Sequence, residues 1–176
     1  MSPVRLASLP NRLSPPEALV FWLGGYWNGK QMVGFAADPR NPFVPPGTAN
    51  PVQRRPPIFY FEETRLYDRD GNGFPEFYPP GVNPKKAAPY VCFFPDAKGN
   101  YSGSYRHSGA AGIAVPYRLD HGGFANPDSF QIIWAGLDND FGSAVNRYFP
   151  SGKGFSAGDF DNLANFSTRL LGDAID

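Results

Sequence analysis

The sequence predicts an α+β fold in which one short helix near the N-terminus packs on a small antiparallel β-sheet with long loops. Three observations lead to this prediction. One segment carries both helix start and helix stop signals, and three short segments are rich in aromatic or β-branched residues, as strands are. Glycine and proline number 20 each among 176 residues. Because both residue types favour turns, loops are expected to outweigh regular elements.

The helix signals begin at Ser14, which is suited to the N-cap position. Pro15 follows at the first helical position, and Glu17 stands three residues after the serine, as in a capping box. The helix is predicted over residues 17–23, and Gly24-Gly25 supply a stop with positive φ. Apolar residues occupy almost all sides of this helix, so we expect it to be largely buried.

Three segments are predicted as strands, and each is bounded by Pro, Gly or Asp: Ile58–Glu62, Tyr90–Phe94 and Phe130–Trp134. No helix-sized crossover pattern separates them, so antiparallel pairing is expected. The length fits one domain. We predict a linker or the remnant of an upstream helix at residues 1–13, and one globular head domain over residues 14–176.

Charge and hydropathy exclude two classes of partner. The 16 basic residues balance 16 acidic ones, and Arg54-Arg55 and Lys85-Lys86 are the only adjacent basic pairs. Nucleic-acid binding, which needs clustered positive charge, is therefore not expected. The longest apolar run, Ala18–Leu23, has six residues, against roughly 20 for a membrane span. Met1–Pro10 has no apolar core of the kind found in signal peptides.

The first candidate metal-binding segment places oxygen-bearing side chains at alternate positions: Asp68, Asp70 and Asn72. This spacing matches the first half of a calcium loop. The twelfth position, which should be a bidentate glutamate, is Pro79, although Glu76 at the ninth position could replace it. The alternative is a tight turn joining two strands, which needs no metal. The sequence favours the turn without excluding calcium.

The second candidate is split between residues 137–140 and residues 159–166, both rich in Asp and Asn. Two acidic loops could close around one hard cation, which takes six to eight oxygen ligands. Without a cation, the carboxylates would repel one another. Alternatively, these are solvated loops in which Asp159 or Asp161 caps a short helix. The residues alone leave both interpretations open.

Catalytic motifs are weak, and we predict that the chain is not an enzyme. His107 and His121 are the only histidines, and neither a nucleophile elbow nor a P-loop, HExxH or GxGxxG motif is present. The rival hypothesis is a hydrolase that uses either histidine. That histidine would then lie in a cleft, hydrogen-bonded to an aspartate and a serine. Cys92, the single cysteine, lies in an apolar run and is predicted to be a buried structural thiol.

Several segments together resemble a known family. Residues 136–142, followed by residues 159–166, resemble the C-terminal calcium loop of the major pseudopilins of type II secretion systems. Residues 17–25, 68–76 and 126–133 resemble head domains of pilin-like proteins that carry prepilin-type methylation motifs. The resemblance runs with gaps from about Pro15 to the C-terminus. Its motifs are short, and their order is the stronger argument.

This resemblance implies a pilin-like head domain and a structural role in a type II secretion or type IV pilus-like filament in the periplasm or cell envelope. The implied partners are other pseudopilin-like subunits or secretion machinery, with no small-molecule substrate. It implies structural Ca²⁺ bound by Asp138, Asp159 and Asp161 and by the Leu137 carbonyl. The family's leader and long apolar helix have no counterpart in these residues.

Two departures separate this sequence from the family pattern. Asp138-Asn139 replaces the usual Asp-Gly, and Phe166 stands where tryptophan is common. The alternative function is a freestanding extracellular binding or adhesion module that uses exposed Tyr and Trp, with carbohydrate as a candidate ligand. An in-frame apolar stretch with a prepilin-type leader, encoded upstream of Met1, would favour the filament function.

Overall fold

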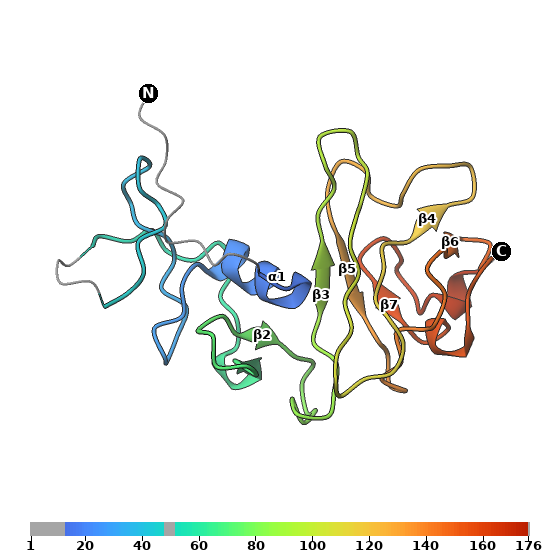
Figure 1. Ribbon diagram of the computed structural model, residues 1–176, viewed down its shortest axis with the longest axis horizontal. Coiled ribbons are helices and arrows are strands. Elements are labelled where there is room, and N and C mark those ends of the chain that lie inside the picture. Colours follow the sequence, from blue (N-terminus) through green and yellow to red (C-terminus); the bar gives the residue numbers. More distant parts are fainter. Residues whose placement is uncertain (1–12, 48–51, 176) are drawn as a thin grey trace. The chain divides into compact units, whose positions relative to one another are not determined.

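A computed structural model describes residues 13–47 and 52–175 of the chain. The chain divides into two compact units, Met1–Pro80 and Gly81–Asp176, and each is described by itself (Figure 1). Residues 1–12 of the predicted linker lie outside the described residues.

The predicted helix is present in the first unit as α1, Pro15–Gly24. Its start follows the predicted pattern, because the Glu17 carboxylate accepts a hydrogen bond from the Ser14 N–H at 2.6 Å. It ends at Gly25, which has a φ of +84°. A Cβ atom on Gly25 would lie 2.3 Å from the carbonyl carbon of Gly34. Both the backbone conformation and the close approach therefore require glycine there.

An aromatic cluster forms the interior of the first unit. The ring of Phe21 lies edge-on to those of Tyr26, Phe35 and Phe74, with centroids 5.1 to 5.6 Å apart. The short 3₁₀ helix η2, Glu63–Arg65, leads into strand β1, Leu66–Tyr67, which pairs antiparallel with β2, Glu76–Phe77.

The strand predicted at Ile58–Glu62 is wrong. No strand is formed there, and the side chains of Ile58 and Tyr60 are 78% and 74% exposed. The backbone N–H groups of Ile58 and Phe59 instead both donate to the Leu23 carbonyl, at 2.8 and 3.0 Å. This carbonyl belongs to the last turn of α1, where carbonyls lack partners within the helix. The segment therefore caps α1 instead of joining a sheet.

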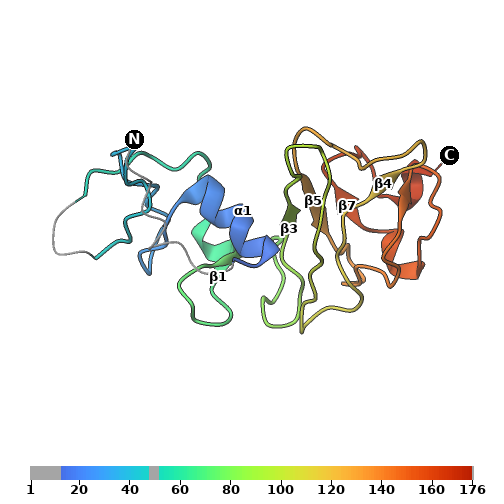
Figure 2. The ribbon, with the colours of Figure 1, turned by 45° about the horizontal axis from the view of Figure 1, so that its top comes forward.

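The second unit is built on a three-stranded antiparallel sheet in the order β3-β5-β7 (Figures 1 and 2). Its strands are β3 at Val91–Phe93, β5 at Gln131–Trp134 and β7 at Leu163–Ala164. Two of the predicted strand segments and their antiparallel pairing are thus confirmed. Strand β7 was not predicted.

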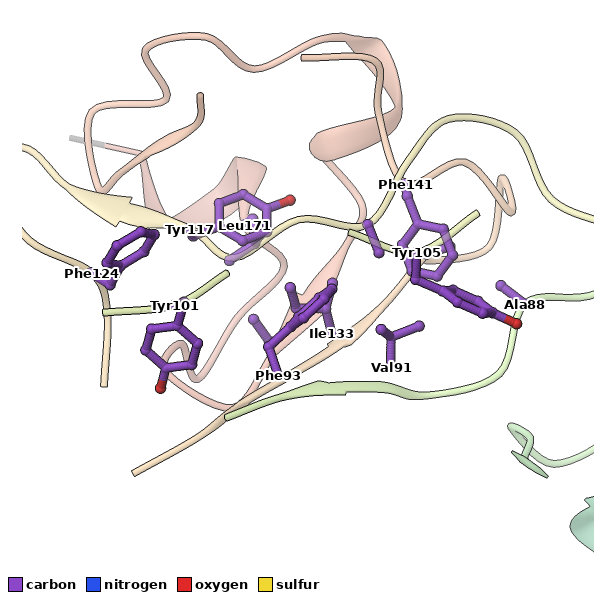
Figure 3. Close-up of a cluster of buried hydrophobic side chains, with 13 residues drawn as sticks. Ala88, Val91, Phe93, Tyr101, Tyr105, Tyr117, Phe124, Ile133, Phe141 and Leu171 are labelled. Carbon is purple, nitrogen blue, oxygen red and sulfur yellow. The ribbon is translucent and has the colours of Figure 1, made fainter. Parts of the chain in front are cut away.

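Loops and short elements complete the second unit. Strand β4, Arg118–Leu119, pairs in parallel with β6, Tyr148–Phe149, and two 3₁₀ helices follow: η3 at Ala157–Asp159 and η4 at Gly172–Ala174. The core lies on one face of the sheet and is largely aromatic (Figure 3). It includes Val91, Phe93, Tyr105, Tyr117, Ile133, Phe141 and Leu171.

The predicted fold class, a pilin-like α+β head with its N-terminal helix packed on a sheet, is wrong. The described residues contain one ten-residue α-helix and three small sheets, and residues in strands or isolated β-bridges outnumber helical ones. In the first unit α1 contacts the two-residue strand β2. The prediction failed because glycine and proline, which favour turns, interrupt the chain often and limit each of these strands to two to four residues. No helix in the described part of the chain is long and apolar enough to span a membrane.

The buried thiol predicted at Cys92 is confirmed: the side chain is buried in β3, and burial raises the pKa of the thiol to about 12. Because the thiolate is the reactive form, we expect an aromatic disulfide reagent at pH 8 to label native Cys92 about 100-fold more slowly than the urea-unfolded chain. Equal labelling rates in the two states would contradict this burial.

Candidate metal centre

The two acidic loops predicted as a split cluster meet because of strand pairing. Strand β5 ends at Trp134, which lies opposite Leu163 of the antiparallel strand β7. The residues that follow β5 therefore lie beside the residues that precede β7. This brings the loop of residues 136–142 against the loop of residues 159–162. The first loop is the β5 loop, and the second is the β7 loop.

The β5 loop wraps around the carboxylate of Asp161. Oxygen Oδ2 of Asp161 accepts hydrogen bonds from the N–H groups of Leu137 and Asp138, at 2.6 and 3.0 Å. Gly136 turns the chain with a φ of +67°, and a Cβ atom there would lie 2.3 Å from Cγ of Asp161. Glycine at this position is thus what permits the close approach.

The carboxyl groups of Asp138 and Asp161 lie next to each other. Burial raises the pKa of Asp138, and the neighbouring Asp161 carboxyl raises it further, against an opposing hydrogen bond that Asp138 Oδ1 accepts from the Asp140 N–H at 2.8 Å. The second oxygen of Asp161, Oδ1, is buried and has no hydrogen-bond partner among the described residues. A buried acceptor without a donor is costly. A cation between the two carboxylates would offset both the repulsion and the missing donor.

The donor chemistry suits a hard divalent cation but does not complete its coordination. Ca²⁺ takes six to eight oxygen ligands, and Asp138 and Asp161 supply two carboxylates. Within residues 13–47 and 52–175, no group of three or more His, Cys, Asp or Glu could hold a metal. The remaining ligands would be backbone carbonyls and water. The role of the Leu137 carbonyl as a ligand remains a prediction.

Asp159, the third predicted side-chain ligand, lies in a buried ion pair. Its Oδ1 lies 3.0 Å from Nε of Arg147 and accepts a hydrogen bond from the Tyr117 hydroxyl at 2.9 Å. Its Oδ2 accepts hydrogen bonds from the N–H and the hydroxyl of Ser156, both at 2.8 Å, and so caps η3. Both oxygens are thus occupied. The N-cap of η3 is Ser156, so Asp159 is its capping-box partner and not the N-cap residue that the alternative expected. Sequence inspection missed Arg147, because one arginine in a polar tail gives no signal of burial.

The acidic loop of the first unit forms the turn that the sequence favoured. Asp68, Asp70 and Asn72 lie between β1 and β2, and their side-chain oxygens accept hydrogen bonds from backbone N–H groups within the loop. The Asn72 side chain also donates to Glu17 Oε1 at 2.7 Å, which ties the loop to α1. These hydrogen bonds account for the loop as a turn between paired strands.

The two histidines occupy different surroundings. His107 is buried, and its Nδ1 accepts a hydrogen bond from the Gly109 N–H at 3.0 Å. His121 is exposed in a turn. The neighbouring Asp120 accepts hydrogen bonds from the N–H and the hydroxyl of Ser151, and these bonds lower its pKa. The Ser151 hydroxyl therefore donates to a carboxylate whose lowered pKa makes it a weaker base, whereas a nucleophilic serine needs a base strong enough to take its proton.

Comparison of this chain with protein-family models, curated proteins and solved structures found no match. The resemblance to pseudopilins therefore depends on the order of short sequence motifs. The meeting of Asp138 and Asp161 is the feature of the structure from which a function can be argued.

Proposed function

We propose that this chain is a non-catalytic structural subunit of a type II secretion or type IV pilus-like filament, whose C-terminal loops are stabilised by a divalent cation. One observation carries the proposal. Asp138 and Asp161, which are 23 residues apart in the sequence, bring their carboxyl groups together around a buried oxygen that lacks a donor. A cation at this position would offset the repulsion between the carboxylates and take the place of the missing donor.

The order of the motifs supports the same function. The β5 loop and the β7 loop are the two segments that resemble the pseudopilin calcium loop, and they are the segments that meet. The proposal does not require the pilin-like head fold, because the site depends on the pairing of β5 with β7 and on the two loops beside that pair. Its partners would be other subunits of the filament, in the periplasm or cell envelope.

The cation would act by linking the loops. Hydrophobic burial anchors only the end of the β5 loop: Phe141 is buried in the core, whereas Leu137, the second residue of the loop, is 92% exposed. Metal binding that occurs only in the folded state adds its binding free energy to the stability of that state. Calcium would therefore hold the exposed start of this loop at Leu137 and Asp138, which burial of apolar side chains does not hold.

Calcium is expected to raise the melting temperature of the chain. At a free Ca²⁺ concentration about 100-fold above the dissociation constant, the stabilisation is about 2.7 kcal/mol, or roughly 5 to 10 °C. Differential scanning calorimetry with Ca²⁺ and with chelator would measure the shift. Asp161→Asn should abolish it, because the variant removes one of the two charges, whereas Asp128→Asn, at an exposed position, should retain it. A wild-type melt that is identical with Ca²⁺ and with chelator would contradict the cation site.

A second function is favoured by a feature of the first unit. A hollow of about 430 Å³ is lined there by Trp22, Phe35, Phe43 and several prolines, and Trp22 is 41% exposed. An apolar hollow of this size with an exposed aromatic ring is suited to a small ligand such as a sugar. Saturable binding of an oligosaccharide, lost in Trp22→Ala, would favour an adhesion module over the filament subunit.

A further inference from the structure

Arg147 is the centre of a buried polar cluster beside the metal centre. Its side chain is fully buried. Nε lies 3.0 Å from Oδ1 of Asp159, Nη2 donates to the Ile113 carbonyl at 2.8 Å, and the guanidinium lies over the Tyr117 ring at 5.6 Å. A buried charge needs a partner, and the ion pair with Arg147 therefore holds Asp159 in place. Nε and Nη1 of Arg147 are buried and form no hydrogen bond among the described residues.

The cluster contacts both loops of the metal centre. Asp159 belongs to the β7 loop, two residues before Asp161. From the β5 loop, Gly142 packs so closely that a Cβ atom on it would lie 2.2 Å from Oδ2 of Asp159. Asn162, also fully buried, donates weakly from Nδ2 to the Phe141 carbonyl at 3.4 Å. The two loops are therefore held together by buried contacts that involve neither Asp138 nor Asp161.

We propose that Arg147 is a positioning residue of the metal centre, which fixes the β7 loop through Asp159 so that the Asp161 carboxylate meets Asp138. The inference rests on the proposed cation site and assigns a different role to Asp159: it is the partner of Arg147 and not a metal ligand.

The physical reason is preorganisation. Two carboxylates repel each other, so without other contacts the loops would separate when no cation is bound. Groups that orient metal ligands from outside the coordination shell typically change metal affinity by about 10- to 100-fold when they are mutated. Loss of the Arg147–Asp159 pair would let the β7 loop move, and cation binding would then include the cost of ordering it.

Calcium affinity in folded variants tests this role. Isothermal titration with CaCl₂, well below each melting temperature, would compare wild type with Arg147→Met and Arg147→Lys. We expect affinity to fall about 10-fold or more in Arg147→Met. In Arg147→Lys, which keeps the charge but loses the planar guanidinium, we expect a smaller fall, so this milder variant also decides the test if Arg147→Met does not fold.

Phe93→Ala is the matched control. Phe93 is buried in β3 within the aromatic core, and its truncation should destabilise the fold to a similar degree. Unchanged calcium affinity in Phe93→Ala, together with weakened affinity in the Arg147 variants, would support positioning. Equal affinity in wild type and both Arg147 variants would overturn it and leave the cation site intact. Absence of calcium binding by wild type would instead overturn the proposed function, and this inference with it.

Discussion

Replacing Arg147 with methionine is expected to lower the free energy of unfolding by about 3–5 kcal/mol, because it leaves a buried carboxylate without its counter-charge. Asp159, the partner, is as fully buried as Arg147, and the two side chains lie 3.0 Å apart. The variant also removes the hydrogen bond to the Ile113 carbonyl. Urea denaturation followed by tryptophan fluorescence would measure the loss, with the chelator present so that calcium does not contribute.

Arg169→Met is the control for this substitution. Arg169 lies in the same unit and is exposed, and an exposed substitution of this kind usually changes stability by less than about 0.5 kcal/mol. Equal stabilities of Arg147→Met and Arg169→Met would show that the buried ion pair adds nothing to the fold, in contradiction to the structure.

Gly136→Ala is expected to eliminate the calcium-dependent rise in melting temperature and to destabilise the chain even without calcium. Its φ of +67° costs an alanine about 1–2 kcal/mol. The added Cβ would also lie 2.4 Å from each carboxylate oxygen of Asp161, so this carboxylate must move away from Asp138. Melting curves with calcium and with chelator would measure both effects.

Gly123→Ala separates the cost of the backbone conformation from the effect of the close contact with Asp161. Gly123 has a similar φ of +75°, and no atom lies within 4 Å of the position of its Cβ. This variant should therefore show the backbone cost alone and keep the calcium-dependent shift. If Gly136→Ala kept the shift as fully as Gly123→Ala, the Asp161 carboxylate would not be part of a cation site.

Local signals in the sequence predicted the elements that depend on neighbouring residues. Helix α1 formed where Ser14, Pro15 and Glu17 indicated its start, because capping involves residues within one turn of each other. Strands β3 and β5 formed within the predicted aromatic and β-branched segments. The same signals failed at Ile58–Glu62, although its composition is typical of a strand. There the backbone N–H groups donate hydrogen bonds to the last turn of α1 instead of pairing with a strand.

For the candidate site, the sequence indicated Asp138 and Asp161 as groups that would repel one another without a cation, and the structure brings them together. It could not separate these residues from Asp159, because an aspartate that binds a cation and one that pairs with a buried arginine look the same in a sequence. The distinguishing residue, Arg147, lies 12 positions before Asp159 in a segment without regular periodicity.

The sequence by itself determined the charge balance, the abundance of turns, the helix with its caps and the acidic character of the two C-terminal loops. These properties follow from composition and from contacts between near neighbours. Only the tertiary structure decided that the chain forms two units with small sheets, that β7 pairs with β5, and that Arg147 engages Asp159 while Asp161 meets Asp138. The reason is that pairing of distant strands and burial of charge depend on which partners come within a few ångströms, and residues distant in sequence meet only in the folded chain.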